Sequence, residues 1–292
     1  MNSADHTRVL FVGRTTLDAL YRLDAMPAED TKAYATAMHA ASGGPATNAA
    51  LTHALLGGDA TLVSPLGIGP WSTPVHDELA RCGVRHIDLA ANTAYETPLV
   101  TVLVNTSRST RTAINPPLSD ISFAALPAAW NPAWGPAPRV VLSDGFHLDA
   151  TLGLLRACRD AGAALVLDGG SWKRGTDALA PMLTAAICSE RFAVPGVAHE
   201  PEATLAWFAT QRVPFAAITR GPKSILVLDR GRRYEIEIEA ICAIDTLGAG
   251  DVLHGAFCYF LARTGDCEQA LREAARVATQ SCSGLGIDAW KR

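Results

Sequence analysis

The chain has 292 residues, of which 49% are hydrophobic and 18% are charged. A chain of this length buries roughly three quarters of its unfolded surface, so it can form a large core without disulfides. The formal net charge is −4, which argues against a nucleic-acid-binding surface. There is no apolar run long enough to span a membrane, and the polar segment Met1–Arg8 lacks the apolar stretch of a signal sequence. We therefore expect a cytoplasmic protein with no membrane partner.

Seven cysteines are scattered along the chain and include no Cys-x-x-Cys pair. This pattern predicts buried free thiols in a reducing compartment rather than a disulfide framework. The histidines show no metal-ligand spacing such as His-Glu-x-x-His, so a zinc site is not expected.

Short apolar runs alternate with alanine-rich amphipathic segments. The apolar runs predict strands at Val9–Val12, Thr61–Val63, Val140–Leu142, Leu165–Leu167, Ala185–Cys188 and Ala216–Thr219. The amphipathic segments predict helices at Ala46–Leu56, Val75–Cys82, Asp149–Ala161, Thr176–Leu183 and Glu200–Gln211. This alternation indicates a mostly parallel sheet with helices on both faces. The segment Asn115–Pro138, rich in Pro, Ala and Trp, is expected to be a packed connection.

Two hairpins interrupt the alternation. Pro98–Val104 and Thr110–Ile114 flank the polar turn Asn105–Ser109, and Thr31–Ala41 is a candidate partner for this hairpin. The second hairpin joins Ser224–Leu228 to Tyr234–Ile238. Its second arm alternates strictly between apolar and acidic residues, so one of its faces should meet water.

The sharpest local motif is Asp-Thr-Leu-Gly-Ala-Gly-Asp, residues Asp245–Asp251, which precedes the apolar stretch Val252–Leu261. Glycines allow close backbone approach, and the start of a helix offers free N–H groups that attract phosphate. A carboxylate beside a bound phosphate can remove the proton from an attacking hydroxyl. The alternative is structural, because aspartate is also common at helix caps and first turns.

Two segments together resemble the signatures of the ribokinase-like (PfkB-type) sugar kinase family. One is Asp245–Asp251 followed by Val-Leu-His-Gly-Ala-Phe, and the other is Gly43–Gly67, which contains Asn48 and Gly57 at the family spacing. The resemblance runs from about Val9 to Ile287, and the ketohexokinase-like branch is the most similar. It implies a three-layer α/β/α fold with a mostly parallel sheet and a small β lid.

The resemblance also implies site residues. It makes Asp251 the catalytic base, and it forms an anion hole for the transferring phosphate from Gly248, Ala249 and Gly250. It places Asp18, Gly43, Gly44 and Asn48 against the hydroxyls of the acceptor, and a carboxylate such as Asp18 accepts hydrogen bonds from two neighbouring hydroxyls.

The expected cofactors are ATP and Mg²⁺. By resemblance, the nucleotide would meet Thr219, Gly221, Ser224, Ala278 and Gly284, although Ser224 replaces a family glycine. The family element Asn-x-x-Glu reads Ser189-Glu190-Arg191-Phe192 here, so its final glutamate is lost and Glu190 is the candidate metal residue. Magnesium keeps most of its waters, so Glu190 could act through one.

Three further residues are candidates to bind ions: two aspartates for cations and one arginine for a phosphate. Asp168, at the end of a predicted strand, is a second candidate for the metal side of the site, and its alternative is a turn aspartate before two glycines. Asp245 is a candidate for a monovalent cation such as K⁺. Arg111 in the lid hairpin is a candidate phosphate contact, with a solvated surface arginine as the alternative.

We therefore expect one kinase domain over residues 1–292, with lid segments at about 14–23, 31–41 and 97–114. The expected reaction transfers the γ-phosphate of ATP to a hydroxyl of a small sugar. Pro45 stands where the family often has a polar side chain, so the sugar need not be ribose or a ketohexose. The alternatives are a nucleoside kinase and a catalytically decayed sugar-binding module. A homodimer through the lid is expected, because an exposed hairpin edge invites pairing.

Overall fold

The structure is a computed structural model that describes residues 7–91, 93–108, 110–117, 122–241 and 243–284. Its main feature is a nine-stranded sheet of order β13-β12-β11-β10-β9-β8-β1-β4-β5. The pairs from β11 through to β5 are parallel, whereas β12 and β13 are antiparallel. The strands are β1 (Arg8–Val12), β4 (Asp59–Ser64), β5 (Arg85–Asp88), β8 (Val140–Ser143), β9 (Ala164–Gly169), β10 (Ala185–Ser189), β11 (Phe215–Arg220), β12 (Lys223–Asp229) and β13 (Arg232–Ile236).

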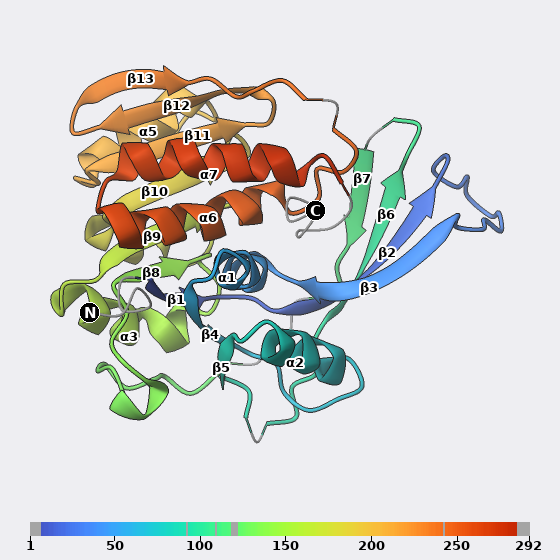
Figure 1. Ribbon diagram of the computed structural model, residues 1–292, viewed down its shortest axis with the longest axis horizontal. Coiled ribbons are helices and arrows are strands. Elements are labelled where there is room, and N and C mark those ends of the chain that lie inside the picture. The colour runs from blue at the N-terminus through green and yellow to red at the C-terminus, as the bar shows by residue number, and fades with distance from the viewer. Residues whose placement is uncertain (1–6, 92, 109, 118–121, 242, 285–292) are drawn as a thin grey trace.

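Helices cover both faces of this sheet, as the alternation predicts (Figure 1). Side chains on β1 alternate between two buried clusters, with Val9 and Phe11 in one and Leu10 and Val12 in the other. The first cluster packs against α1 (Pro45–Leu55), α2 (Ser72–Arg81), α6 (Ala249–Thr264) and α7 (Cys267–Ser281). The second packs against α3 (Leu148–Asp160), α4 (Thr176–Leu179) and α5 (Pro201–Thr210). The result is the predicted three-layer α/β/α arrangement.

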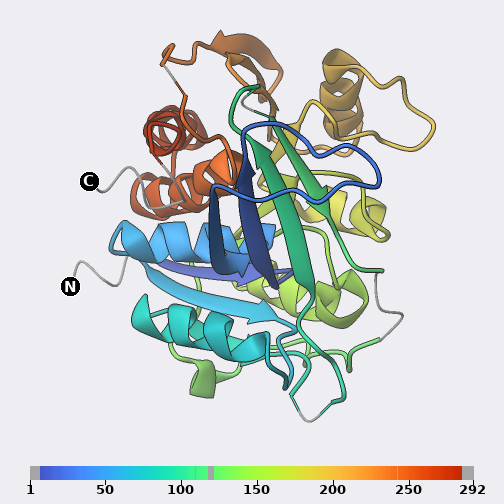
Figure 2. The same ribbon diagram turned by 90° about the vertical axis from the view of Figure 1, so that its right-hand side faces the viewer.

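A four-stranded small sheet stands apart from the layers at one end of the molecule (Figures 1 and 2). Its order is β3-β2-β6-β7. The strands are β2 (Thr16–Leu23), β3 (Ala37–Gly43), β6 (Leu99–Asn105) and β7 (Thr110–Ile114). The predicted hairpin of β6 and β7 is confirmed, although Ser109 in its turn lies outside the described residues.

The predicted pairing of Thr31–Ala41 with that hairpin is wrong. The strand begins only at Ala37 and pairs with β2, and β2 stands between it and β6. The physical reason is burial, because the apolar side chains Leu17, Ala19 and Leu23 of β2 are buried and occupy the centre of the sheet. The small, exposed residues of β3 suit an edge position.

Two smaller differences concern Thr176–Leu183 and the cysteines. The helix α4 ends at Leu179 and a 3₁₀ turn, Ala180–Met182, follows, because Pro181 has no N–H to continue the α-helical pattern. Cys158, Cys188, Cys258 and Cys282 are buried as predicted, whereas Cys82 and Cys267 are half-buried. Cys242 lies outside the described residues.

The connection 115–138 is only partly packed: Phe123 is buried, and Leu126, Trp130 and Trp134 (in the 3₁₀ turn Pro132–Trp134) pack against the second cluster. The second arm of the β12–β13 hairpin alternates as predicted, with Ile236 buried and its neighbours exposed. None of the helices described is long and apolar enough to cross a membrane.

Candidate active site

The carboxyl ends of the parallel strands meet at one edge of the main sheet, where open α/β sheets bind ligands. Asp168 lies in β9, Glu190 directly follows β10, and Thr219 lies in β11. Asp144 directly follows β8, and Arg14 lies two residues beyond the end of β1. Candidate residues from distant parts of the sequence therefore line one edge.

The glycine-rich loop runs into α6 at this edge. Gly248 is the N-cap with φ 73°, a left-handed conformation that favours glycine. The Asp245 carboxylate accepts a hydrogen bond from the Leu247 N–H at 2.8 Å, so it shapes the loop. Among the described residues, no partner accepts from the N–H of Gly250 or Asp251, as expected for the first turn of a helix. A side chain at Gly250 would meet open space.

Asp251, in the first turn of α6, is bound by α1. The Asn48 amide Nδ2 donates to Asp251 Oδ2 at 2.7 Å. The two helices approach closely at Gly255, where a Cβ atom would lie 2.3 Å from the Ala49 carbonyl oxygen. The side chain of Asp251 thus bonds to another helix rather than to a backbone N–H of its own first turn, and the simple capping interpretation is not supported.

The surroundings of Asp251 favour the protonated form of its carboxyl group. Burial of the carboxyl raises the pKa of Asp251 to about 7, and the negative charge of Asp168 adds to this rise. The Asn48 amide opposes it by hydrogen bonding to the charged form. On the other side of Asn48, its Oδ1 is buried without a hydrogen-bond partner among the described residues, so it is free to accept from a ligand hydroxyl.

Asp18 lies in β2, where the Thr16 hydroxyl donates to its Oδ1 at 2.6 Å. Gly43, opposite Thr16 in β3, makes room for it, because a Cβ at position 43 would lie 2.2 Å from Asp18 Oδ1. Burial raises the pKa of Asp18, while Thr16 and the positive charge of Arg14 oppose the rise. The structure therefore gives Gly43 a packing role beneath the Asp18 carboxylate. The Gly44 N-cap starts α1 next to it.

Asp168, in β9, is buried against His254 of α6. Its Oδ2 lies 3.4 Å from His254 Nδ1 and has no hydrogen-bond partner in the described part of the chain. His254, one turn beyond Asp251 on α6, also has Nδ1 2.8 Å from the Gly250 carbonyl oxygen and Nε2 3.0 Å from that of Ile187. Burial raises the pKa of Asp168 to about 7. Sequence reasoning missed His254, although its spacing of three residues from Asp251 puts both on one face of a helix.

Asp144 is a second residue that sequence reasoning missed. Its carboxylate accepts hydrogen bonds from the backbone N–H groups of Arg14 at 2.9 Å, Phe146 at 3.0 Å and Ala46 at 3.2 Å. It therefore ties the end of β1, the start of α1 and its own turn together. Burial raises its pKa to about 7. The available signal was an aspartate directly after a buried strand and before a glycine.

Arg111 connects the small sheet to the glycine-rich loop. Its Nη1 donates to the Thr246 hydroxyl at 2.8 Å. Val100 pairs with Asp18, Val104 pairs with Arg111, and alternate residues of a strand share a face. Asp18 and Arg111 thus lie on the same face of the small sheet. Arg111 is exposed and contacts the loop through this one hydrogen bond, so both interpretations of it stay open.

The candidate nucleotide residues form a second group. Thr219 lies beside Glu190, whose N–H donates to the Thr219 carbonyl oxygen at 2.9 Å. Gly221 has φ 63° and open space at its Cβ position. The Ser224 hydroxyl is engaged by Arg220 at 2.9 Å and by Glu235. Ala278 is buried in α7, and Gly284 follows the end of that helix.

The candidate metal residues do not converge. Glu190 is exposed, Asp168 is buried beside His254, and Asp245 bonds within its own loop. In the described ranges, no group of three His, Cys, Asp or Glu side chains is arranged to hold a metal ion.

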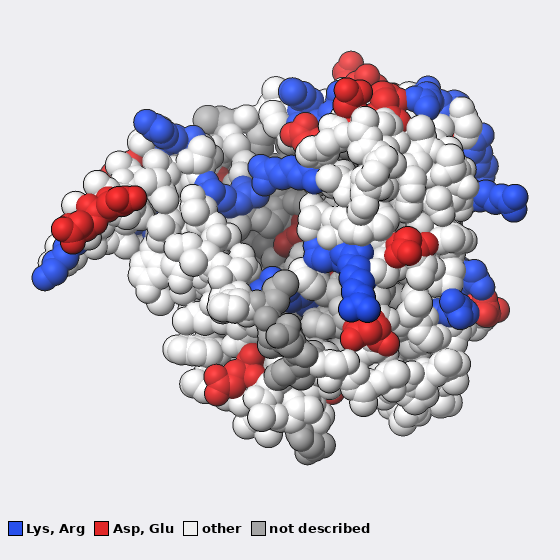
Figure 3. All heavy atoms as spheres, turned by 180° about the vertical axis from the view of Figure 1, so that it is seen from behind, with Lys and Arg blue, Asp and Glu red and all other residues white. Residues whose placement is uncertain are grey.

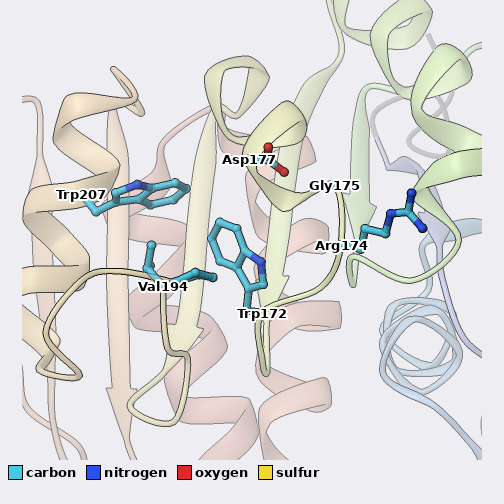
Figure 4. A pocket seen from close by; sticks show the side chains of 7 residues that line it. Trp172, Arg174, Gly175, Asp177, Val194 and Trp207 are labelled. Atoms are coloured by element: carbon cyan, nitrogen blue, oxygen red, sulfur yellow. The ribbon is translucent and has the colours of Figure 1, made fainter.

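A separate cavity of about 560 Å³ opens on the α4–α5 side of the sheet. Figure 4 shows Trp172, Val194 and Trp207 side by side in it, while Arg174 points away from them. The two indole rings are 5.4 Å apart in an edge-to-face arrangement. This cavity contains none of the predicted site residues.

Similarity to known proteins agrees with this geometry. The family model described as "pfkB family carbohydrate kinase" matches residues 6–289. A deoxyribokinase from Salmonella typhi is 33% identical over 69 residues, which cover 24% of this chain and 22% of the deoxyribokinase. The chain thus matches about a fifth of that relative's length.

Solved structures share the fold over nearly the whole chain. A protein from Agrobacterium tumefaciens, provisionally named a ribokinase, has a TM-score of 0.81 at 24% identity, covering 96% of this chain and 92% of that one. A microbiome-derived acarbose kinase has a TM-score of 0.80 at 20% identity, with 96% and 94% covered. Arabidopsis thaliana ribokinase, solved with ribose and ATP, has a TM-score of 0.75 at 20% identity, with 97% and 95% covered. The chain belongs to the pfkB family of carbohydrate kinases.

Proposed function

We propose that this protein transfers the γ-phosphate of ATP to a hydroxyl of a small sugar or sugar-like acceptor, with Asp251 as the general base. The observation that carries the proposal is the Asn48–Asp251 pair beside the open first turn of α6. It puts a carboxylate with a raised pKa next to unpaired backbone N–H groups. Proton removal from a hydroxyl and stabilisation of phosphoryl charge need these two features.

The residues present fit a nucleotide phosphate. The N–H groups of Gly250 and Asp251 have no partner in the described part of the chain, and the space beside Gly250 is open. A helix N-terminus with free N–H groups favours an anion. Bound ATP would supply the electrophilic γ-phosphorus, and Thr219, Gly221, Ser224, Ala278 and Gly284 would border the rest of the nucleotide.

In this mechanism Asp251 accepts the proton of the attacking hydroxyl. Asn48 holds Asp251 Oδ2, which orients the carboxylate and leaves Oδ1 for the acceptor. The unpartnered Asn48 Oδ1 accepts from a neighbouring hydroxyl. The Gly248–Gly250 backbone donates hydrogen bonds to the phosphoryl oxygens, and a pKa near 7 suits a base that works at neutral pH.

The small sheet is proposed to act as the lid. Asp18 and Arg111 lie on one of its faces, and Arg111 already contacts Thr246 in the loop. Closure of this face over the acceptor would exclude water from the transfer. Asp18 would then accept from two acceptor hydroxyls, as a carboxylate does.

Magnesium is proposed to travel with the phosphates of ATP. Glu190 would reach it through water, because it is exposed at the end of β10. Asp168, with its unpartnered buried Oδ2, is a second candidate. Asp245 would help to bind a monovalent cation, such as K⁺, beside the glycine-rich loop.

A nucleoside acceptor is less well supported than a sugar. Tyr95 is buried, so of these two tyrosines only Tyr34, which is 90% exposed, could stack on a base. The ring of Phe146 is covered by Arg14 and Lys173. A sugar-binding module without activity remains the third alternative.

ATP turnover against a panel of sugars and nucleosides tests the three alternatives. We expect ADP release that depends on a sugar and gives a phosphorylated sugar. Turnover with nucleosides alone would favour the nucleoside kinase. Sugar binding with no turnover under any condition would favour the inactive module.

A further inference from the structure

Two cationic side chains converge on one aromatic ring at the active-site edge. The Arg14 guanidinium carbon lies 5.4 Å from the centroid of the Phe146 ring, and the Lys173 ammonium lies 4.5 Å from it. Arg14 follows β1, Phe146 follows β8, and Lys173 follows β9. Three neighbouring strands of the sheet thus bring two positive charges together.

Neither cation is neutralised by a direct ion pair. Within the described residues, no carboxylate oxygen lies within 4 Å of the Arg14 guanidinium nitrogens or of the Lys173 ammonium nitrogen. The Lys173 ammonium donates to the hydroxyl and to the carbonyl oxygen of Ser171. Burial lowers the pKa of Lys173, the negative charges of Asp144 and Asp168 oppose this change, and the charge of Arg14 lowers the pKa further. An anion bound to both side chains would offset the electrostatic repulsion between their two positive charges.

The pair belongs to the acceptor side of the site. The Arg14 N–H is bound by Asp144, and the Arg14 carbonyl oxygen accepts from the Thr47 hydroxyl at 3.2 Å, so its backbone is held. Arg14 lies two residues before Thr16, whose hydroxyl donates a hydrogen bond to Asp18. Strand β1 is four positions from β11, the strand of Thr219, or about 19 Å at the usual strand spacing.

The surface beside the small sheet carries charges of both signs. In Figure 3, Lys and Arg side chains lie at the rim of the hollow between the small sheet and the main body, and acidic atoms are visible inside it. Asp18 and Asn48 already offer hydrogen-bond partners to neutral hydroxyls. The two cations therefore form a positively charged site, which a neutral sugar would not need.

We propose that Arg14 and Lys173 bind an anionic group of the acceptor, so that the substrate is a sugar or polyol that already carries a phosphate or a carboxylate. This inference rests on the proposed kinase function. The group bound by the pair does not react. The acceptor hydroxyl oxygen forms the new bond to the γ-phosphorus, the bond from that phosphorus to the oxygen of the departing ADP breaks, and Asp251 takes the hydroxyl proton.

Matched acceptors test the proposal. The purified protein is assayed with ribose against ribose 5-phosphate, fructose against fructose 6-phosphate, and glucitol against gluconate. We expect the charged member of at least one pair to have a kcat/KM at least about 10-fold higher than its neutral partner, the size of one good ionic contact. Comparison of the two phosphorylated sugars with gluconate identifies whether a phosphate or a carboxylate is preferred.

Two variants link the preference to the pair. Arg14→Gln and Lys173→Met are each expected to raise the KM for the charged acceptor about 10-fold, with little change for neutral acceptors or for ATP. Arg14→Lys should restore part of the preference. Arg156→Gln, an exposed arginine on α3, is the matched control and should change nothing. Circular dichroism verifies that each variant is folded.

The outcomes separate this inference from the proposed function. Equal or better turnover of the neutral partners overturns the anionic acceptor and leaves the kinase intact. An effect of the two variants on the KM for ATP instead would assign the pair to the nucleotide phosphates and also overturn it. Calorimetric binding of the charged sugars without any turnover would reject the kinase function while keeping the anion site.

Discussion

The amide of Asn48 donates a 2.7 Å hydrogen bond to the carboxylate of Asp251, which lies 203 residues away in the sequence. The bond joins the first turns of α1 and α6, the two helices that begin directly after the glycine motifs. It brings the two motifs together in space. The carboxylate is oriented from one side and faces the open start of α6 on the other.

The first prediction concerns Asp251→Asn. Asparagine has nearly the same shape, so the fold should survive, but an amide cannot take the hydroxyl proton. Loss of a general base costs about 10²–10⁴ in rate, or roughly 3–5 kcal/mol of barrier. We expect kcat to fall by that factor in steady-state assays, with the KM for ATP little changed.

A matched substitution separates chemistry from helix capping. Asp149 occupies the first turn of α3 and is exposed, so Asp149→Asn removes a similar charge from a similar position. This control should keep full activity. If the folded Asp251→Asn variant retained about half of the wild-type kcat, the assignment of the base would be wrong.

The second prediction is a pH profile. Burial raises the pKa of Asp251 to about 7, and a base must be deprotonated to act. Activity should therefore be low below pH 7, rise through it and level off above it. Asn48→Ala removes the bond that favours the charged form, so its midpoint should move to higher pH. A wild-type midpoint near the ordinary aspartate range would contradict the environment described for Asp251.

Much of the fold was predictable from the sequence because it depends on local patterns. The apolar runs of the parallel strands, such as Val9–Val12, are long enough to be recognised, and the glycine motifs mark the starts of α1 and α6. The weak pattern of residues 31–41 was not enough to identify the partner of β3. That choice depends on which strand buries its apolar face at the centre of the small sheet, which is a property of the assembled sheet.

The site was predictable in its motifs and not in its supporting contacts. Asp18, Asn48 and Asp251 stand in recognisable segments. The contact of His254 with Asp168 depends on how α6 packs on β9. The convergence of Arg14 with Lys173 on Phe146 arises from the order of β1, β8 and β9 in the sheet. Strand order is set by long-range packing, so no local spacing in the sequence reveals it.

The third prediction concerns Gly43→Ala. The new Cβ would lie 2.2 Å from Asp18 Oδ1, so the Asp18 carboxylate must move. We expect the KM for the acceptor to rise at least about 10-fold with a smaller change in the KM for ATP, measured in initial-rate assays. Gly153→Ala on α3 is the control, because its Cβ would meet Ala128 at an ordinary 3.4 Å. An unchanged acceptor KM in Gly43→Ala would show that Asp18 does not contact the acceptor.

The fourth prediction concerns the metal. The described residues provide no ready-made metal cluster, so the ion should arrive with the phosphates of ATP. Activity should require Mg²⁺ and be abolished by excess EDTA. Glu190→Gln should raise the Mg²⁺ concentration needed for half-maximal activity without abolishing turnover. Full activity in EDTA would remove the metal from the proposed function.

The last prediction concerns assembly through the small sheet. Its edge strands β3 and β7 are exposed, with Met38 58% and Ile114 55% accessible to solvent. Exposed strand edges with apolar side chains invite pairing, and a second copy of the same sheet offers a matching edge. We expect a homodimer joined through the small sheets, measured by light scattering at micromolar concentration. Met38→Lys should shift the protein toward the monomer, whereas Met26→Lys, outside the strands but 41% exposed, should not. A wild-type protein that stays monomeric would exclude this dimer and leave the proposed chemistry, which lies within one chain, unaffected.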